Sequence, residues 1–183
     1  MRSKIIIVAA ILLSVASAVQ AQKMVVDVDQ TVDFTSFKSY AWDVGQIAPR
    51  ATTSQMIVSA IERELNSRGL VRNDETPDIR IAVMAAAGMD LQGVGPSWNN
   101  ERYKSWGGAA YGNPAALMNV TKGTLLIDLI ETKNKHSIWR GVAKDVFVAP
   151  TTGNPEKDAA EMRSLVNKTV EKMFKKYPVK RGK

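Results

Sequence analysis

The strongest constraint on the fold is a pair of apolar stretches, residues 121–131 and 137–148, joined by a short polar connection. Both stretches are rich in Leu, Ile and Val, and the connection at 132–136, Thr-Lys-Asn-Lys-His, has the length of a hairpin loop. We therefore expect two neighbouring antiparallel strands here.

One pair of opposite charges sets the register of this hairpin. If Thr132 faces His136, then Asp128 faces Arg140. A register one residue longer would separate the two charges, and facing opposite charges contribute ~0.2–1 kcal/mol, so the first register is preferred. It also places Leu126 opposite Val142 and Ile130 opposite Ile138, with Leu125, Ile127, Leu129 and Trp139 on the other face.

The rest of the chain adds strands and two amphipathic helices. Strands are predicted at 24–29, 38–42 and 78–86, and helices at 53–68 and 155–177. We predict an α+β fold: an antiparallel sheet of four or five strands with both helices packed on one face.

Capping residues give the expected ends of the two helices. Thr52 or Thr53 is predicted to cap the first helix, and Gly69 to end it. Pro155 suits the first position of the second helix, and Pro178 stops it. The apolar stripe of the second helix includes Leu165, Val166 and Phe174, and Trp139 is expected to pack beneath these three residues.

The first 21 residues are typical of an export signal. Arg2 and Lys4 precede the uncharged apolar run 5–13, and small residues stand at the expected cleavage site after Ala21, with Ala18 as the competing site. The run is too short for a convincing membrane span, which needs ~20 apolar residues. We expect a signal peptide at 1–21, a single envelope domain at 22–183 without a transmembrane span, and a periplasmic or otherwise exported location.

The chain has no cysteine. Lipid attachment to an exported bacterial protein would need a cysteine after the apolar run, so no lipid anchor is expected, and the core has to form without disulfides. The formal charge of +7 falls by two to +5 once Arg2 and Lys4 leave with the signal. This moderate charge and the export signal argue against a nucleic-acid partner.

Residues 88–120 follow no regular period and hold half of the 12 glycines, together with four large aromatic residues. A connection this long is usually functional or disordered. One interpretation is an aromatic-stapled loop that covers one end of the sheet. The other is a binding surface, because aromatic rings offer large contact area at little entropic cost. The candidate binding residues are Trp98, Tyr103, Trp106 and Tyr111.

Several short motifs resemble a bacterial cell-envelope family, often lipoproteins, catalogued as domain of unknown function 4136. They are Val26-Asp27-Val28-Asp29, Asp33-Phe34, Phe37-Lys38-Ser39-Tyr40-Ala41-Trp42, Pro77-Asp78-Ile79, Gly123 to Leu129, Ile138-Trp139-Arg140-Gly141 and the final Tyr177-Pro178. The resemblance spans nearly the whole mature chain and implies an exported domain of mixed α and β structure. It implies no reaction and no catalytic residues.

The residues themselves indicate no catalytic, metal or cofactor site. His136 is the only histidine and is expected to be a solvated turn residue. Glu62 and Glu64 are two positions apart on a helix and cannot share a face as an acid/base pair. We interpret Asp128, Trp139 and Arg140 as structural residues.

The C-terminal end is strongly basic, through Lys168, Lys172, Lys175, Lys176, Lys180, Arg181 and Lys183. Such a run is usually a solvated helix face followed by a frayed tail, and attraction to anionic lipid or wall polymer is the functional alternative.

For function we expect a non-enzymatic binding or assembly module of the envelope, whose partner is an envelope protein, a wall polymer or a lipid surface. The alternative is a hydrolase acting on an envelope polymer, with Asp90, Glu101 and Asp128 in one cleft. A third hypothesis is a purely structural role in an oligomer, which a large exposed apolar patch would favour.

Overall fold

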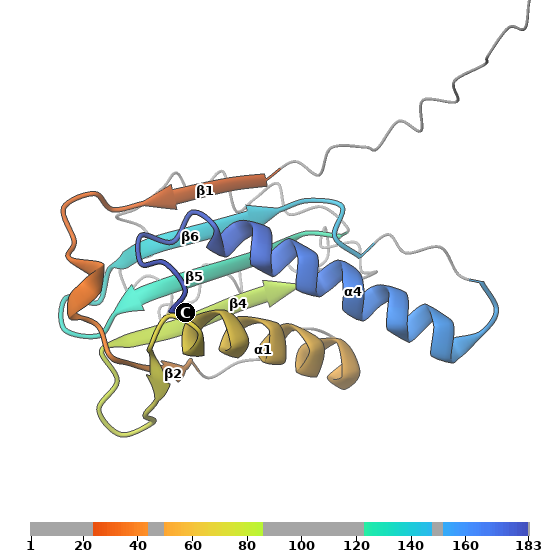
Figure 1. Cartoon of the computed structure of the whole chain (residues 1–183), viewed down its shortest axis with the longest axis horizontal. Helices are drawn as coiled ribbons and strands as arrows, with labels where there is room; N and C mark the ends of the chain where they lie inside the picture. The colour runs from red at the N-terminus through yellow and green to blue at the C-terminus, as the bar shows by residue number, and fades with distance from the viewer. Residues whose placement is uncertain (1–23, 44–49, 86–122, 148–151, 183) are drawn as a thin grey trace, which may run out of the picture.

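The computed structural model describes residues 24–43, 50–85, 123–147 and 152–182. In chain order the elements are β1 (Met24–Val28), the 3₁₀ turn η1 (Phe34–Ser36), β2 (Ser39–Trp42), α1 (Ala51–Asn66), β3 (Val71–Arg72), β4 (Ile79–Ala85), β5 (Leu125–Glu131), β6 (Ser137–Ala143) and α4 (Pro155–Phe174). The strands form one sheet in the order β1-β6-β5-β4-β2-β3. Helices α1 and α4 lie side by side on one face of it (Figure 1).

The α+β fold with two helices is as predicted, but the sheet differs in size and direction. It has six strands and is mixed, because β2 pairs parallel with both β3 and β4. Strand β3 has only two residues, too few to show a period in the sequence. The parallel pairing arises because the chain runs from β2 through α1 before it enters β4.

Asp78 fixes the start of the parallel β2–β4 pair. Its Oδ2 accepts hydrogen bonds from the backbone amides of Lys38 and Ser39 and from the Ser39 hydroxyl, at 2.8–2.9 Å. Burial alone would raise the pKa of Asp78, but these hydrogen bonds outweigh it and lower the pKa. The carboxylate thus joins two segments that lie 39 residues apart in the sequence.

The predicted hairpin register is confirmed at its centre and wrong near its turn. Asp128 faces Arg140 as expected, and Leu129 faces Trp139. Ile130, however, faces Ser137 and not Ile138, because an irregularity between Leu129 and Ile130 leaves Ile138 as an extra residue of β6. This bulge directs the Ser137 hydroxyl to Asp128, to which it donates a hydrogen bond.

The core lies between the sheet and the two helices. Trp139 is 1% exposed, and its ring centroid lies 4.9 Å from that of Phe174 on α4, as the sequence predicts. Gly141 leaves room for this indole: a Cβ atom there would lie 2.7 Å from Met173 Cε and 2.8 Å from the Trp139 ring. The contact between β6 and α4 therefore depends on a glycine two residues after the tryptophan.

The helix ends differ from the prediction by a few residues. Helix α1 begins at Ala51 after Arg50, which makes no side-chain cap, so neither threonine is the cap. It ends at Asn66, two residues before the predicted end, and Gly69 takes the expected left-handed conformation at φ +85°. Asn154 caps α4 by accepting from the amides of Glu156 and Lys157, with Pro155 in the first turn.

Of the helices described, none combines the length and apolar character that crossing a membrane requires.

Candidate functional site

A groove of about 940 Å³ lies between the N-terminal halves of α1 and α4. Both helices begin at the same end of the sheet (Figure 1). Its apolar lining includes Met56, Phe147 and Met162, which also pack against the core. Its volume falls within the range of ~300–1,000 Å³ that is usual for ligand sites.

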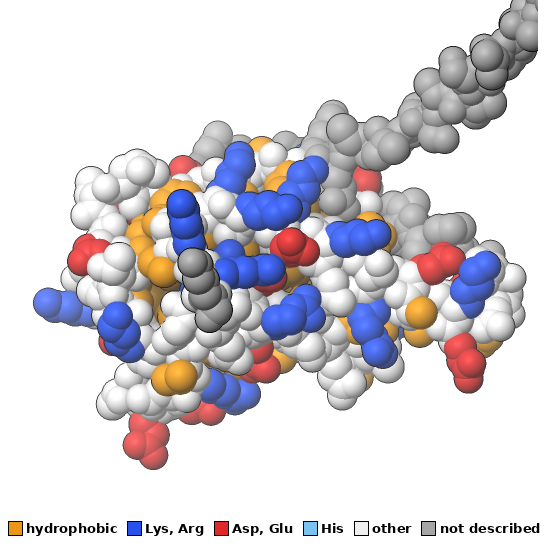
Figure 2. Space-filling view, viewed as in Figure 1, with side chains coloured by type: hydrophobic (Ala, Val, Ile, Leu, Met, Phe, Trp, Pro, Cys, Tyr) orange, Lys and Arg blue, Asp and Glu red, His pale blue; other side chains and the backbone are white. Residues whose placement is uncertain are grey.

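Three arginines give the groove a positive character. Arg50 lies at the start of α1, whereas Arg63 from α1 and Arg163 from α4 lie further along the two helices. In the described part of the chain, no carboxylate forms an ion pair with any of the three. Figure 2 looks onto this helical face and shows Lys and Arg side chains spread over it, with fewer acidic ones among them.

The acidic side chain that lines the groove is Asp158, and it is already engaged. Its Oδ1 accepts hydrogen bonds from the amide and the hydroxyl of Thr152. The hydrogen bond from the hydroxyl, followed by that from the amide, lowers the pKa of Asp158. Asp158 therefore stabilises the turn before α4 and does not pair with the groove arginines.

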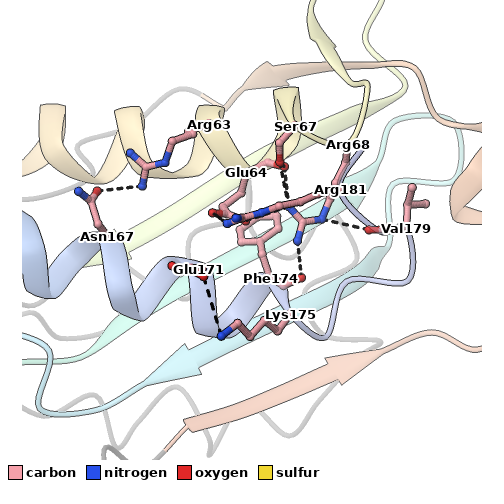
Figure 3. A network of polar contacts seen from close by, with 10 residues as sticks. All are labelled: Arg63, Glu64, Ser67, Arg68, Asn167, Glu171, Phe174, Lys175, Val179 and Arg181. Atoms are coloured by element: carbon pink, nitrogen blue, oxygen red, sulfur yellow. Dashed lines mark hydrogen bonds and ion pairs between the residues drawn. The ribbon is translucent and has the colours of Figure 1, made fainter. Parts of the chain in front are cut away.

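Arg63 and Asn167 bridge the two helices at the inner part of the groove. The Arg63 Nη2 atom donates to the Asn167 Oδ1 atom at 3.1 Å (Figure 3). Asn167 is neutral, so this hydrogen bond orients the guanidinium without compensating its charge.

Beyond this bridge, a buried carboxylate joins the helix ends. Glu64 is 0% exposed, and its carboxylate binds two guanidinium groups, those of Arg68 and Arg181 (Figure 3). Removing either arginine would leave the buried Glu64 carboxylate with less positive charge to balance it. The helices are thus tied together at one end by charged groups and separated by the groove at the other.

Arg68 is the centre of this network. Its guanidinium donates to the carboxylate and backbone oxygen of Glu64, to the Phe174 carbonyl at 2.8 Å and, through Nε, to the Val179 carbonyl at 3.0 Å. It also lies 5.5 Å from the centroid of the Phe174 ring and 5.8 Å from that of Tyr177. One side chain therefore connects α1, the end of α4 and the segment that follows.

The expectation of a frayed C-terminal tail is wrong for residues 177–182. Tyr177 is buried, which raises the pKa of its hydroxyl. Arg181 pairs with Glu64, and the Gly182 amide donates to the Ser67 carbonyl at 2.7 Å. The tail is held because a buried acidic group on α1 needs its arginine. The lysines of α4 and of the turn that follows it are solvated as predicted: Lys168, Lys172, Lys175 and Lys176 are exposed.

Asp128 and Arg140 form an ion pair on neighbouring strands, and Asp128 is 1% exposed.

His136 is less solvated than predicted. Its side chain is 25% exposed, with Nε2 3.7 Å from Asp29 Oδ2 and Nδ1 3.7 Å from Glu131 Oε2. Asp29 follows β1, which pairs antiparallel with β6, and the hydrogen bond from its amide to the Ile138 carbonyl continues this pairing and brings its carboxylate near the imidazole.

The four aromatic candidates Trp98, Tyr103, Trp106 and Tyr111 lie outside the described residues, as do Asp90 and Glu101.

The sequence prediction missed the Glu64 network and the groove. Glu64 falls on the buried stripe of α1, four residues after Ala60 and four before Arg68, so a carboxylate on an apolar face was the available signal. The groove had no comparable signal, because its walls come from helices about 100 residues apart in the sequence.

These features define an α+β protein with a mixed six-stranded sheet and two helices on one face. The chain belongs to the DUF4136 family, a domain of unknown function, whose sequence pattern matches residues 24–179.

Solved structures show the same fold. A DUF4136 family protein from Bacteroides thetaiotaomicron is similar with a TM-score of 0.58 at 12% identity, over 86% of this chain and 96% of that one. A PDZ domain protein from Parabacteroides distasonis is similar with a TM-score of 0.51 at 17% identity, over 87% of this chain and 36% of that one. No curated protein matches the sequence significantly.

Proposed function

We propose that this protein is an exported, non-enzymatic binding module of the cell envelope, and that the α1–α4 groove is its contact site. The observation that carries the proposal is the groove itself, which combines a partly buried apolar lining with three arginines that no described carboxylate pairs with. A partner that supplies apolar side chains and negative charge would satisfy both features.

Export is supported by the sequence of residues 1–21, which has the charged start, the apolar run and the small residues of a signal. We expect the protein from a periplasmic fraction to begin at Gln22 and to carry no acyl chain, because no cysteine is available for lipidation. Intact-mass spectrometry of that fraction measures both properties. A protein recovered only in detergent extracts, with its first 21 residues intact, would contradict the proposal.

Two neighbouring alanines provide a test of the groove. Ala159 and Ala160 are both exposed on α4, but only Ala159 lines the groove. An Ala159→Trp variant should fill it, and the Ala160→Trp variant adds the same indole outside it. We expect capture of envelope components from a native extract to fall with Ala159→Trp and to stay at the wild-type level with Ala160→Trp.

The same capture experiment compares the groove with the aromatic candidates. A paired Trp98→Ala, Trp106→Ala variant tests whether these residues also contribute to binding. Loss with this pair and normal capture with Ala159→Trp would move the contact site away from the groove. Equal capture by all variants would contradict a binding role for both regions.

No observation favours the hydrolase alternative. Of its three acidic residues only Asp128 is described, and its carboxylate is engaged by Ser137 and Arg140. A structural role in an oligomer would be favoured by a large exposed apolar patch. Among the described residues, the exposed large apolar side chains are Val25 and Val71, which lie on the two opposite edge strands and so form no such patch.

A further inference from the structure

The α1–α4 groove has an apolar middle, with arginines near both ends and Asp158 at the end where the two helices begin. Arg50 stands before the first turn of α1, and Arg63 lies 13 residues further along the same helix. At 1.5 Å per residue, these positions are about 20 Å apart along the axis. Met56 and, from α4, Met162 lie between them, and Phe147 adds a ring from the segment after β6.

We propose that the groove binds an acidic amphipathic helix of a partner protein, with carboxylates near both ends of the helix and apolar side chains between them. This inference rests on the proposed function, because it specifies the partner of the same site. Two side-by-side helices present ridges and grooves into which a third helix packs, and apolar anchors at helical spacing are a known mode of peptide recognition.

Charge complementarity selects an acidic occupant. Arg63 uses one of its donors on the neutral Asn167, and its other donors remain available to a carboxylate. Arg163 is one turn before Asn167 on α4, so two guanidinium groups lie near the inner end of the groove. Arg50 supplies the positive charge at the opposite end.

The apolar middle suits side chains of varied shape. Met56 and Met162 are partly buried against the core and also line the groove. Methionine adapts to different apolar partners because it is unbranched and polarisable. A peptide with Leu or Met at successive turns could therefore insert several side chains.

The test uses a fluorescein-labelled helical peptide of about four turns, with Glu at both ends and Leu on one face. A second peptide replaces each Glu with Lys, and a third replaces each Leu with Gln. Fluorescence anisotropy with the mature protein should show saturable binding of the first peptide only. Affinity should fall as salt is raised, because the contact is electrostatic in part.

Charge reversal gives the decisive comparison. An Arg63→Glu, Arg163→Glu variant should bind the acidic peptide at least about tenfold more weakly, since two attractions become repulsions. The same variant should bind the Lys peptide better than wild type does. The matched control Lys168→Glu, Lys172→Glu changes two exposed cations of α4 outside the groove lining and should leave both affinities unchanged.

The inference is wrong if the acidic peptide fails to bind, if the Lys peptide binds wild type equally well, or if the control pair loses as much affinity as the groove pair. The proposed function is tested separately by envelope capture. Capture that depends on Ala159 without peptide binding would retain the groove as a contact site and reject an acidic helix. Binding of the acidic peptide without capture that depends on Ala159 would support an acidic helix as a ligand of the groove and reject the proposed contact with envelope components.

Discussion

An Arg68→Ala variant should lose about 3–5 kcal/mol of unfolding free energy, the cost usual for removing one partner of a buried ion pair. Arg68 has a side chain only 4% exposed, and it donates to Glu64, Phe174 and Val179. Its removal leaves the Glu64 carboxylate with Arg181 alone, whose side chain is 46% exposed. Urea unfolding followed by far-ultraviolet circular dichroism measures the change.

The matched control for Arg68→Ala is Arg63→Ala, one turn and one residue earlier on α1. Arg63 is exposed and donates to the neutral Asn167, so its loss should change the unfolding free energy by much less. An Arg68→Lys variant should be intermediate, because lysine keeps the charge and loses the planar fork. Equal midpoints for Arg68→Ala and Arg63→Ala would show that the network does not hold the two helices together.

A Trp139→Ala variant should lose about 3–5 kcal/mol, as large-to-small substitutions of buried aromatic residues do. The indole is 1% exposed and packs on Phe174, and Gly141 and Met173 shape the space around it. Urea unfolding again measures the effect.

Val25→Ala is the control for Trp139→Ala, because Val25 is 66% exposed on the edge strand β1. Its unfolding free energy should stay within about 0.5 kcal/mol of wild type. A wild-type midpoint for Trp139→Ala would mean that the sheet face under α4 contributes little to stability.

The hairpin shows what local sequence can predict. The Asp128–Arg140 pair set the register correctly, because the alternative would have separated two charges that face each other. The bulge at Ile138 was not predictable from alternation, since an extra residue changes the period only where it occurs. The error was confined to the pairing next to the turn.

The sheet direction depended on contacts between distant segments. Asp78 binds the backbone at Lys38 and Ser39 and so joins the starts of β2 and β4, which pair in parallel. Nothing in the pattern of either strand distinguishes this parallel pairing from an antiparallel one. The same holds for Glu64, whose position on an apolar stripe was visible while its partner Arg181, in the C-terminal tail, was not.

The motifs that carry the family resemblance mainly hold the fold together. Asp33 caps the 3₁₀ turn, Asp78 fixes β2, Asp128 pairs with Arg140, and Trp139 fills the core. Family membership therefore predicts the architecture and leaves the ligand open. None of these residues lines the groove, so the proposed contact site is separate from the family motifs.

Photo-crosslinking in cells tests whether the groove between α1 and α4 contacts a partner. A photoreactive amino acid placed at Ala159 lies in the groove, and one placed at Lys172 lies on the exposed part of α4 outside it. We expect a defined, irradiation-dependent adduct from position 159 and none from position 172. Absence of any adduct at 159, or the same adduct from both positions, would contradict it.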